Sequence, residues 1–134
     1  MSNEITPLTL GWTIVYVDDP VAASAFYAGT FGLTPEFAAP DGSYAQLDTG
    51  QTKLAFASYA LAESNFPGGV MRADADRPPN VEITLVTDDV DGATHVALDA
   101  GCTSLAEPVD KPHGQRVAFL RDPFGTLIEI GTPM

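Results

Sequence analysis

The chain has 134 residues, of which 45% are hydrophobic and 18% charged, and its formal net charge is −12. This length suits one domain with its own core, and the excess of acidic residues argues against nucleic acid or anionic membranes as partners. A single cysteine, Cys102, excludes an intramolecular disulfide, and the first residues lack the pattern of a signal peptide. We therefore predict a cytoplasmic protein.

The first half of the sequence predicts a strand, a helix and three further strands. Residues 9–17 are rich in β-branched and aromatic side chains, which is typical of a strand. Asp19 can cap a helix that begins at Pro20, and Gly32 suits its end. Turn residues then separate short strands at about 34–39, 43–48 and 52–58.

The second half repeats the first with an offset that aligns Asp19 with Asp89. A strand at 81–87 precedes a helix at 89–100, which either Asp88 or Asp89 can cap. Further strands are expected near 103–108, 115–121 and 126–131. Between the halves, residues 60–80 are rich in proline, glycine and charge, which predicts either a linker or a flap over a pocket.

Two stretches carry a resemblance to a known family. "VDDPVAASAFYAGTFGL" and "GQRVAFLRDPFGTLIEI" resemble motifs of the vicinal oxygen chelate superfamily, which includes glyoxalases, bleomycin-resistance proteins and extradiol dioxygenases. The resemblance implies an α+β fold in which two βαβββ modules form a curved, cup-like mixed sheet with helices on its outer face. On this basis residues 1–134 form one domain, with modules at about 7–59 and 81–133, and homodimers are expected.

The resemblance also indicates which positions face the cup. Metal-dependent members of the superfamily place four ligands on the strands, and the matching positions here are Trp12, Ala55, Glu82 and Glu129. Alanine has no donor atom, and an indole nitrogen offers no usable lone pair. Because the two histidines lie elsewhere, we expect neither a catalytic metal of the glyoxalase type nor another cofactor.

Strand alternation extends this set of cup residues. If Trp12 faces the cup, so do Ile14 and Tyr16, and if Glu82 does, so does Thr84. The segment "KPHGQRVAFLRDPFG" resembles one that borders the ligand in drug-binding members, with His113 where those proteins often have Trp. The predicted ligand-binding residues are therefore Trp12, Ile14, Tyr16, Ala55, Glu82, Thr84, His113, Arg116 and Glu129.

Three functions remain open from the sequence. The first is metal-independent binding of a small, partly aromatic molecule in the cup, as in drug or toxin sequestration. The second is a metal-dependent lyase, isomerase or dioxygenase that uses Glu82 and Glu129. The third is an interaction module without catalysis. Each residue also has a plainer role, since Trp12 could simply fill the cup and the two glutamates could share one proton.

Overall fold

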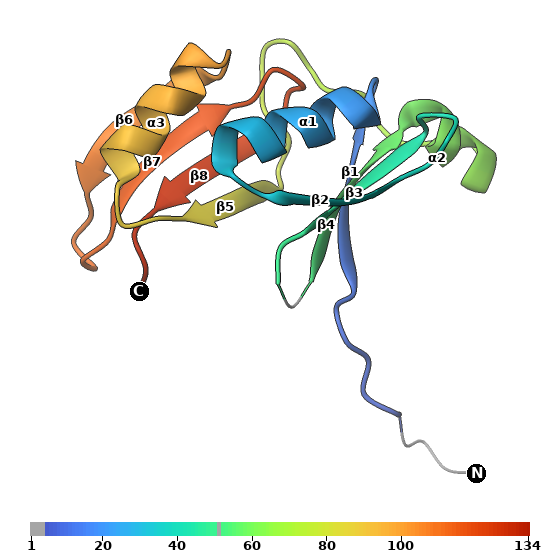
Figure 1. Ribbon diagram of the computed structural model, residues 1–134, viewed down its shortest axis with the longest axis horizontal. Helices are drawn as coiled ribbons and strands as arrows, with labels where there is room; N and C mark the ends of the chain where they lie inside the picture. The colour runs from blue at the N-terminus through green and yellow to red at the C-terminus, as the bar shows by residue number, and fades with distance from the viewer. Residues whose placement is uncertain (1–4, 51) are drawn as a thin grey trace.

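The two halves fold into two βαβββ modules (Figure 1). The computed structural model describes residues 5–50 and 52–134. The first module contains β1 (Trp12–Val17), α1 (Pro20–Phe31), β2 (Thr34–Ala38), β3 (Tyr44–Asp48) and β4 (Lys53–Ser58). After α2 (Tyr59–Asn65), the second contains β5 (Glu82–Val86), α3 (Val90–Asp99), β6 (Thr103–Asp110), β7 (Arg116–Arg121) and β8 (Leu127–Gly131). The predicted α+β class and repeated βαβββ arrangement are confirmed.

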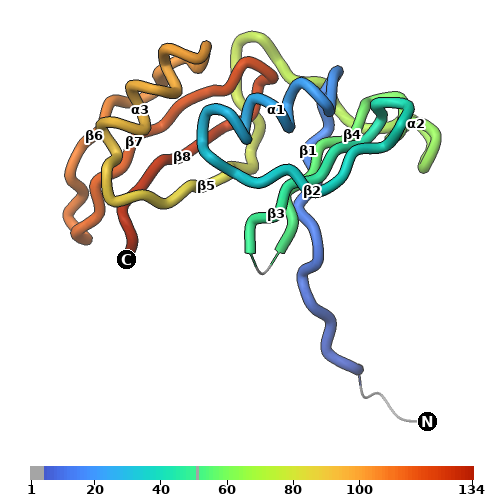
Figure 2. Tube along the Cα trace, in the orientation of Figure 1, coloured from blue at the N-terminus to red at the C-terminus, as the bar shows by residue number. Residues whose placement is uncertain are grey.

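Each module has its own four-stranded mixed sheet. The strand orders are β1-β4-β3-β2 and β5-β8-β7-β6, with β1 parallel to β4 and β5 parallel to β8. The two sheets lie toward opposite ends of the long axis of the molecule (Figures 1 and 2). Among the described residues, no strand of one sheet contacts a strand of the other.

α1 and α3 begin where the sequence predicts, and each covers one face of its sheet. Asp19 accepts a hydrogen bond from the backbone N–H of Ala22 at 3.1 Å, and Asp89 accepts one from Gly92 at 2.9 Å. α1 packs on β2, β3 and β4, whereas α3 packs on β6, β7 and β8. No helix in the described part of the chain is long and apolar enough to span a membrane.

A buried hydrogen bond joins the two modules. The Tyr27 hydroxyl on α1 donates to Asp122 Oδ2 at 2.6 Å, and Asp122 lies in the turn between β7 and β8. Asp122 also accepts backbone N–H groups from Phe124 at 2.9 Å and Thr126 at 2.7 Å. Both side chains are buried in the interior shared by the modules, and this burial raises the pKa of Tyr27 and of Asp122.

The segment between the modules is more ordered than the sequence indicates. It starts with α2, whose first turn is capped by Ser58, because the Ser58 hydroxyl accepts the Leu61 N–H at 3.1 Å. Residues 70–80, here named the strap, then run without helix or strand toward β5. A serine directly before a helix is a usual N-cap, and this signal was present in the sequence.

Tyr27→Phe tests the contact between the modules. We expect the free energy of unfolding to fall by about 1–3 kcal/mol, because the buried Asp122 carboxyl loses its side-chain donor. Urea denaturation measures the change. Tyr16→Phe is the matched control, since the Tyr16 hydroxyl makes no hydrogen bond to a protein group within the described part of the chain. Equal losses in both variants would contradict the prediction.

Candidate functional site

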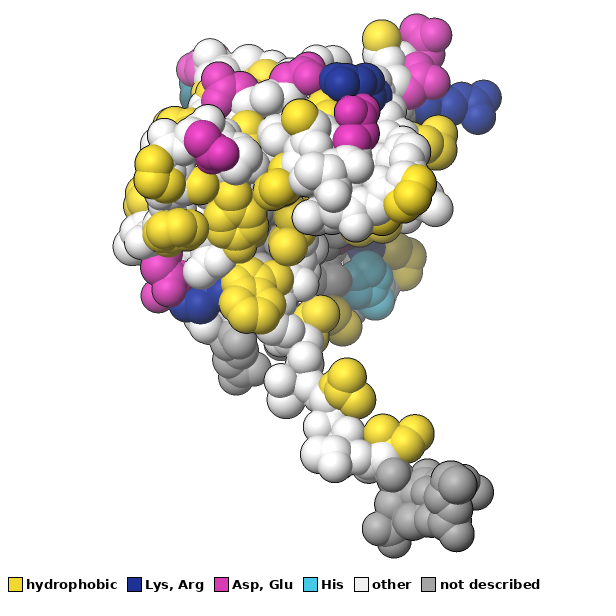
Figure 3. All heavy atoms as spheres, turned by 90° about the vertical axis from the view of Figure 1, so that its right-hand side faces the viewer, with side chains coloured by type: hydrophobic (Ala, Val, Ile, Leu, Met, Phe, Trp, Pro, Cys, Tyr) yellow, Lys and Arg dark blue, Asp and Glu magenta, His cyan; other side chains and the backbone are white. Residues whose placement is uncertain are grey.

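The first sheet has one exposed face rich in aromatic side chains. Trp12, Ile14 and Tyr16 alternate along β1 with Val15 and Val17, which pack with the core, as the sequence predicts. Trp12 is 57% exposed and Ile14 is 41% exposed. Figure 3 views the end of the molecule that carries this sheet and shows hydrophobic side chains gathered there. We name the outward side chains of Trp12, Ile14, Tyr16, Phe37 and Tyr44 the aromatic face.

A glutamine organises this face. The Trp12 indole Nε1 donates to Gln46 Oε1 at 2.9 Å, and the Tyr44 hydroxyl donates to the same oxygen at 2.6 Å. Gln46 is the β3 neighbour of Ala55, which is buried and is also the β4 neighbour of Ile14. The structure therefore brings together Trp12, Ile14, Tyr16 and Ala55 on one sheet. Gln46 was not among the predicted ligand-binding residues. It alternates along β3 with the buried Ala45 and Leu47, and this alternation indicates that its side chain points outward.

The second sheet carries an acid pair, Glu82 and Glu129. Glu82 Oε2 accepts the Thr84 hydroxyl at 2.7 Å, and Thr84 is the register neighbour of Glu129. The hydrogen bond with Glu82 raises the pKa of Glu129 above its ordinary value of 4.5, and burial and repulsion by the Glu82 charge raise it further. Glu129 therefore retains its proton to a higher pH than an isolated glutamate does.

His113 lies close enough to the acid pair for its charge to lower the pKa of Glu129, against the stronger effects that raise it. His113 Nε2 lies 2.7 Å from Gln115 Oε1, and Gln115 Nε2 donates to the Thr132 carbonyl at 2.7 Å. The loop that holds His113 is thus tied to the end of β8. The structure therefore places Glu82, Thr84, His113 and Glu129 in one neighbourhood of the second sheet.

Arg116 lies apart from this group. Its guanidinium pairs with Asp91 at 2.9 Å and with Asp110 at 3.3 Å. Asp91 belongs to α3, and Arg116 alternates on β7 with the same parity as the buried Ala118 and Leu120. The side chain therefore lies on the helix-covered face of the sheet, and this position does not support the predicted ligand-binding role of Arg116.

The aromatic face and the acid pair belong to different sheets. Within residues 5–50 and 52–134, no strand of one sheet contacts a strand of the other. The four positions that match the metal ligands of the superfamily are therefore not brought together by strand pairing. Trp12 and Ala55 lie on the first sheet, whereas Glu82 and Glu129 lie on the second. A ligand that touches all four requires the two sheet faces to be brought opposite each other.

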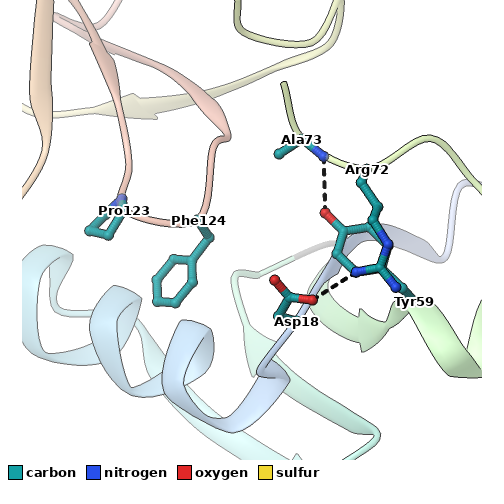
Figure 4. A pocket seen from close by; sticks show the side chains of 6 residues that line it. All are labelled: Asp18, Tyr59, Arg72, Ala73, Pro123 and Phe124. Carbon is teal, nitrogen blue, oxygen red and sulfur yellow. Dashed lines mark hydrogen bonds and ion pairs between the residues drawn. The ribbon is translucent and has the colours of Figure 1, made fainter. Parts of the chain in front are cut away.

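The strap is fixed to both modules. Arg72 pairs with Asp18 at 2.9 Å and lies over the Tyr59 ring, 4.4 Å from its centre, while the Ala73 N–H donates to the Tyr59 hydroxyl at 3.2 Å (Figure 4). On the other side, Arg121 donates to the Ala75 carbonyl at 3.0 Å and to the Asp74 carbonyl. These contacts involve both side chains and backbone of the strap, and sequence periodicity contains no signal for them.

Beneath the strap lies a cavity of about 580 Å³, here named the junction pocket. It is bounded by the edge strand β1, by the start of β5, by the turn before β8 and by the strap itself. Its lining includes Ile14, Tyr16, Met71, Arg77, Val81 and Phe124. The predicted residues Ile14 and Tyr16 thus reach this pocket from the edge of the first sheet, whereas Trp12 and the acid pair do not line it.

The sequence matches the family model of the Glyoxalase/Bleomycin resistance protein/Dioxygenase superfamily over residues 9–130. The chain belongs to this superfamily. That family explains the duplicated βαβββ module, and it confirms the resemblance that the two sequence motifs carry. The fold itself hosts different chemistries, so membership does not identify the ligand.

Individual relatives agree with this assignment. The chain is 32% identical over 129 residues to CFP32 of Mycobacterium bovis and of Mycobacterium tuberculosis, whose name assigns it provisionally to the glyoxylases. The match covers 93% of this chain but 44% of those relatives, so the chain spans less than half of their length.

Solved structures share the fold at lower identity. A glyoxalase/bleomycin resistance protein/dioxygenase family enzyme from Burkholderia phytofirmans PsJN has a TM-score of 0.78 at 24% identity, covering 95% of this chain and 100% of that one. A glyoxalase-related enzyme from Fulvimarina pelagi has a TM-score of 0.79 at 20% identity, covering 93% and 88%.

The donor atoms present do not fit the metal centre of the metal-dependent members. Within the described residues, no three His, Cys, Asp or Glu side chains lie together in a way that could hold a metal ion. Glu82 and Glu129 lie close enough for Glu82 to raise the pKa of Glu129, and the matching positions on the first sheet are Trp12 and Ala55. Two carboxylates without imidazole ligands fall short of the usual sites for iron or zinc.

Glu129→Gln tests the shared proton. The pKa of Glu129 is raised in the folded state, so protonated Glu129 contributes fully to stability below pH 4.5. That contribution is lost as the pH rises through the folded-state pKa. Glutamine cannot ionise, so we expect the variant to have a higher Tm than the wild type at neutral pH. The difference should vanish in acid, as measured by thermal unfolding across pH.

Glu107→Gln is the matched control for this measurement. Glu107 is an exposed glutamate on β6 with no ion pair within the described residues, and its replacement removes the same charge from an acidic protein. A pH-dependent gain of the same size in this variant would assign the effect to net charge rather than to the acid pair.

Proposed function

We propose that the protein binds a small, partly aromatic molecule on the aromatic face without a metal ion. The observation that carries this proposal is the exposed indole of Trp12, which Gln46 holds at 2.9 Å beside the Tyr44 hydroxyl bonded to the same oxygen. Because this hydrogen bond orients an open aromatic ring, little further ordering is needed before a flat molecule stacks on it.

The acid pair indicates a second property of the proposed ligand. A protonated carboxyl donates a hydrogen bond, while its ionised partner accepts one or pairs with a cation. Glu82, Thr84, Glu129 and His113 therefore suit a polar or cationic group on the ligand. A flat aromatic amine combines both requirements.

The two sheet faces come together, in our proposal, when two copies of the chain form a homodimer. The first sheet of one copy faces the second sheet of the other, and a cup closes between them. Exposed side chains such as Trp12, Ile14 and Phe37 support this proposal, because an apolar patch of this kind marks an interaction surface. In a two-fold dimer the same contact occurs twice, which gives two cups.

A metal-dependent lyase, isomerase or dioxygenase that uses Glu82 and Glu129 is the alternative. The similarity to CFP32, with its provisional glyoxylase assignment, favours it. Elemental analysis of protein purified without chelators separates the two functions. A stoichiometric divalent metal that disappears in Glu129→Gln would replace the binding proposal with this one.

Trp12→Ala tests the aromatic face. With the planar dye proflavine as the probe, we expect calorimetry to show binding to the metal-free protein and about tenfold or greater weakening in the variant, because aromatic stacking contributes on the order of 1–3 kcal/mol. Phe66→Ala is the control, since Phe66 is an exposed aromatic residue at the end of α2. Equal affinity in the wild type and Trp12→Ala would reject the aromatic face as the site.

Mixing two defective variants tests whether the cup closes between copies. Trp12→Ala damages the first sheet and Glu129→Ala the second, so each homodimer should bind poorly. In an equimolar mixture about half of the dimers are mixed, each with one intact cup, which restores about a quarter of wild-type capacity. Light scattering gives the oligomeric state, and calorimetry counts the sites. No recovery in a mixture shown to contain mixed dimers would mean that the cup does not form between copies.

A further inference from the structure

The junction pocket has the size and lining of a ligand site. Its volume of about 580 Å³ lies within the range of about 300–1,000 Å³ that is usual for small-molecule pockets. Most of its lining is apolar, with contributions from Ile14, Val70, Ile83 and Phe124. A few polar groups border this lining, which is the arrangement that orients a bound molecule.

Basic residues are concentrated around this pocket. The chain has six lysines and arginines, and Arg72, Arg77 and Arg121 lie on or against the strap. Arg72 is paired with Asp18, and Arg121 donates to backbone carbonyls of the strap and of Gly125. These two arginines therefore hold the strap in place.

Arg77 is the basic residue left available at the pocket. In residues 5–50 and 52–134, no acidic side chain lies within ion-pair distance of Arg77. Asp74, which also lines the pocket, accepts the Asp76 N–H at 2.7 Å and keeps its negative charge, so an anion would be held on the Arg77 side of the pocket. An anion that enters the pocket can thus pair with Arg77 without displacing an existing ion pair.

The strap holds the pocket in a preformed state. Glycine at position 125 allows the turn before β8 to touch the strap, because a Cβ there would lie 2.6 Å from the Ala73 Cβ. Together with the Arg72 and Arg121 contacts, this close packing fixes the strap against both modules. A preformed pocket binds with a smaller loss of conformational entropy than a loop that must order first.

We propose that the junction pocket is a second small-molecule site, which adjoins the aromatic face through Ile14 and Tyr16 but includes neither Trp12 nor the acid pair. Its ligand has an aromatic or branched aliphatic body and one negative charge, which pairs with Arg77 at the rim. This preference is opposite to that proposed for the cup, where the acid pair favours cations and hydrogen-bond donors. A small aromatic carboxylate or sulfonate is the class of molecule that fits.

Anilinonaphthalene sulfonate, which joins an aromatic body to one anionic group, is the probe for this site. We expect its fluorescence to rise on binding to the folded protein, and amide shifts in NMR spectra to concentrate in residues 13–16, 70–83 and 124–126. Trp12→Ala, which alters the cup, should leave this binding unchanged. Failure of the cup proposal therefore leaves this test intact.

Arg77→Gln and Lys111→Gln form a matched pair of variants that each remove one positive charge. We expect Arg77→Gln to weaken binding of the sulfonate about fivefold, in the range of an exposed ion pair, and Lys111→Gln to change it little. Neutral phenylnaphthylamine should bind the wild type and Arg77→Gln equally. A third variant, Val81→Trp, should block both probes, because a large ring replaces an exposed lining residue.

The site is overturned by any of three results. The first is amide shifts that map to Trp12, Phe37, Tyr44 and the acid pair instead of the strap and its neighbours. The second is equal weakening by Arg77→Gln and Lys111→Gln, which would reflect net charge alone. The third is unchanged binding in Val81→Trp while circular dichroism shows a native fold.

Discussion

The buried hydrogen bond between Tyr27 and Asp122 is the interaction on which the arrangement of the two modules depends. Each module can satisfy its own backbone through its sheet and helix, but the packing of α1 against the second module requires a specific contact. Tyr27 is fully buried, and its hydroxyl must therefore find a partner in the interior. Asp122 provides that partner and also orders its own turn through two backbone N–H groups.

The same turn connects the core to the strap. Arg121 precedes Asp122 and donates to carbonyls of the strap, while Gly125 at the other end of the turn lets Ala73 approach closely. The geometry that Asp122 imposes on this turn therefore determines where the strap lies. The turn that Asp122 orders lines the junction pocket through Phe124, Gly125 and Thr126, whereas Tyr27 does not line it.

Much of the fold could be predicted from the sequence because its signals are local. The helix caps Asp19 and Asp89 and the alternation of Val15 and Val17 with outward residues depend on near neighbours, and the structure has them as expected. Contacts between distant residues had no such signal. The bond from Tyr27 to Asp122 spans 95 positions, and the separation of the two sheets depends on how the helices pack.

At Arg116, a segment resemblance and strand parity point in different directions. Its predicted role came from a segment resembling a drug-binding border, although its alternation with Ala118 and Leu120 already indicated the helix-covered face. Strand parity follows from backbone geometry, whereas a segment resemblance says nothing about which face a particular side chain occupies. Where the two conflict, parity is the stronger guide.

The distribution of charge gives a physical basis for two sites of opposite preference. With a net charge of −12, the surface as a whole repels anions, so a local cation is needed before any anion can bind. The strap supplies that cation at Arg77, and it uses Arg72 and Arg121 to hold its own position. The acid pair on the second sheet reinforces the overall negative field instead. The opposite charge preferences that we propose for the cup and for the junction pocket thus rest on where the few basic residues lie.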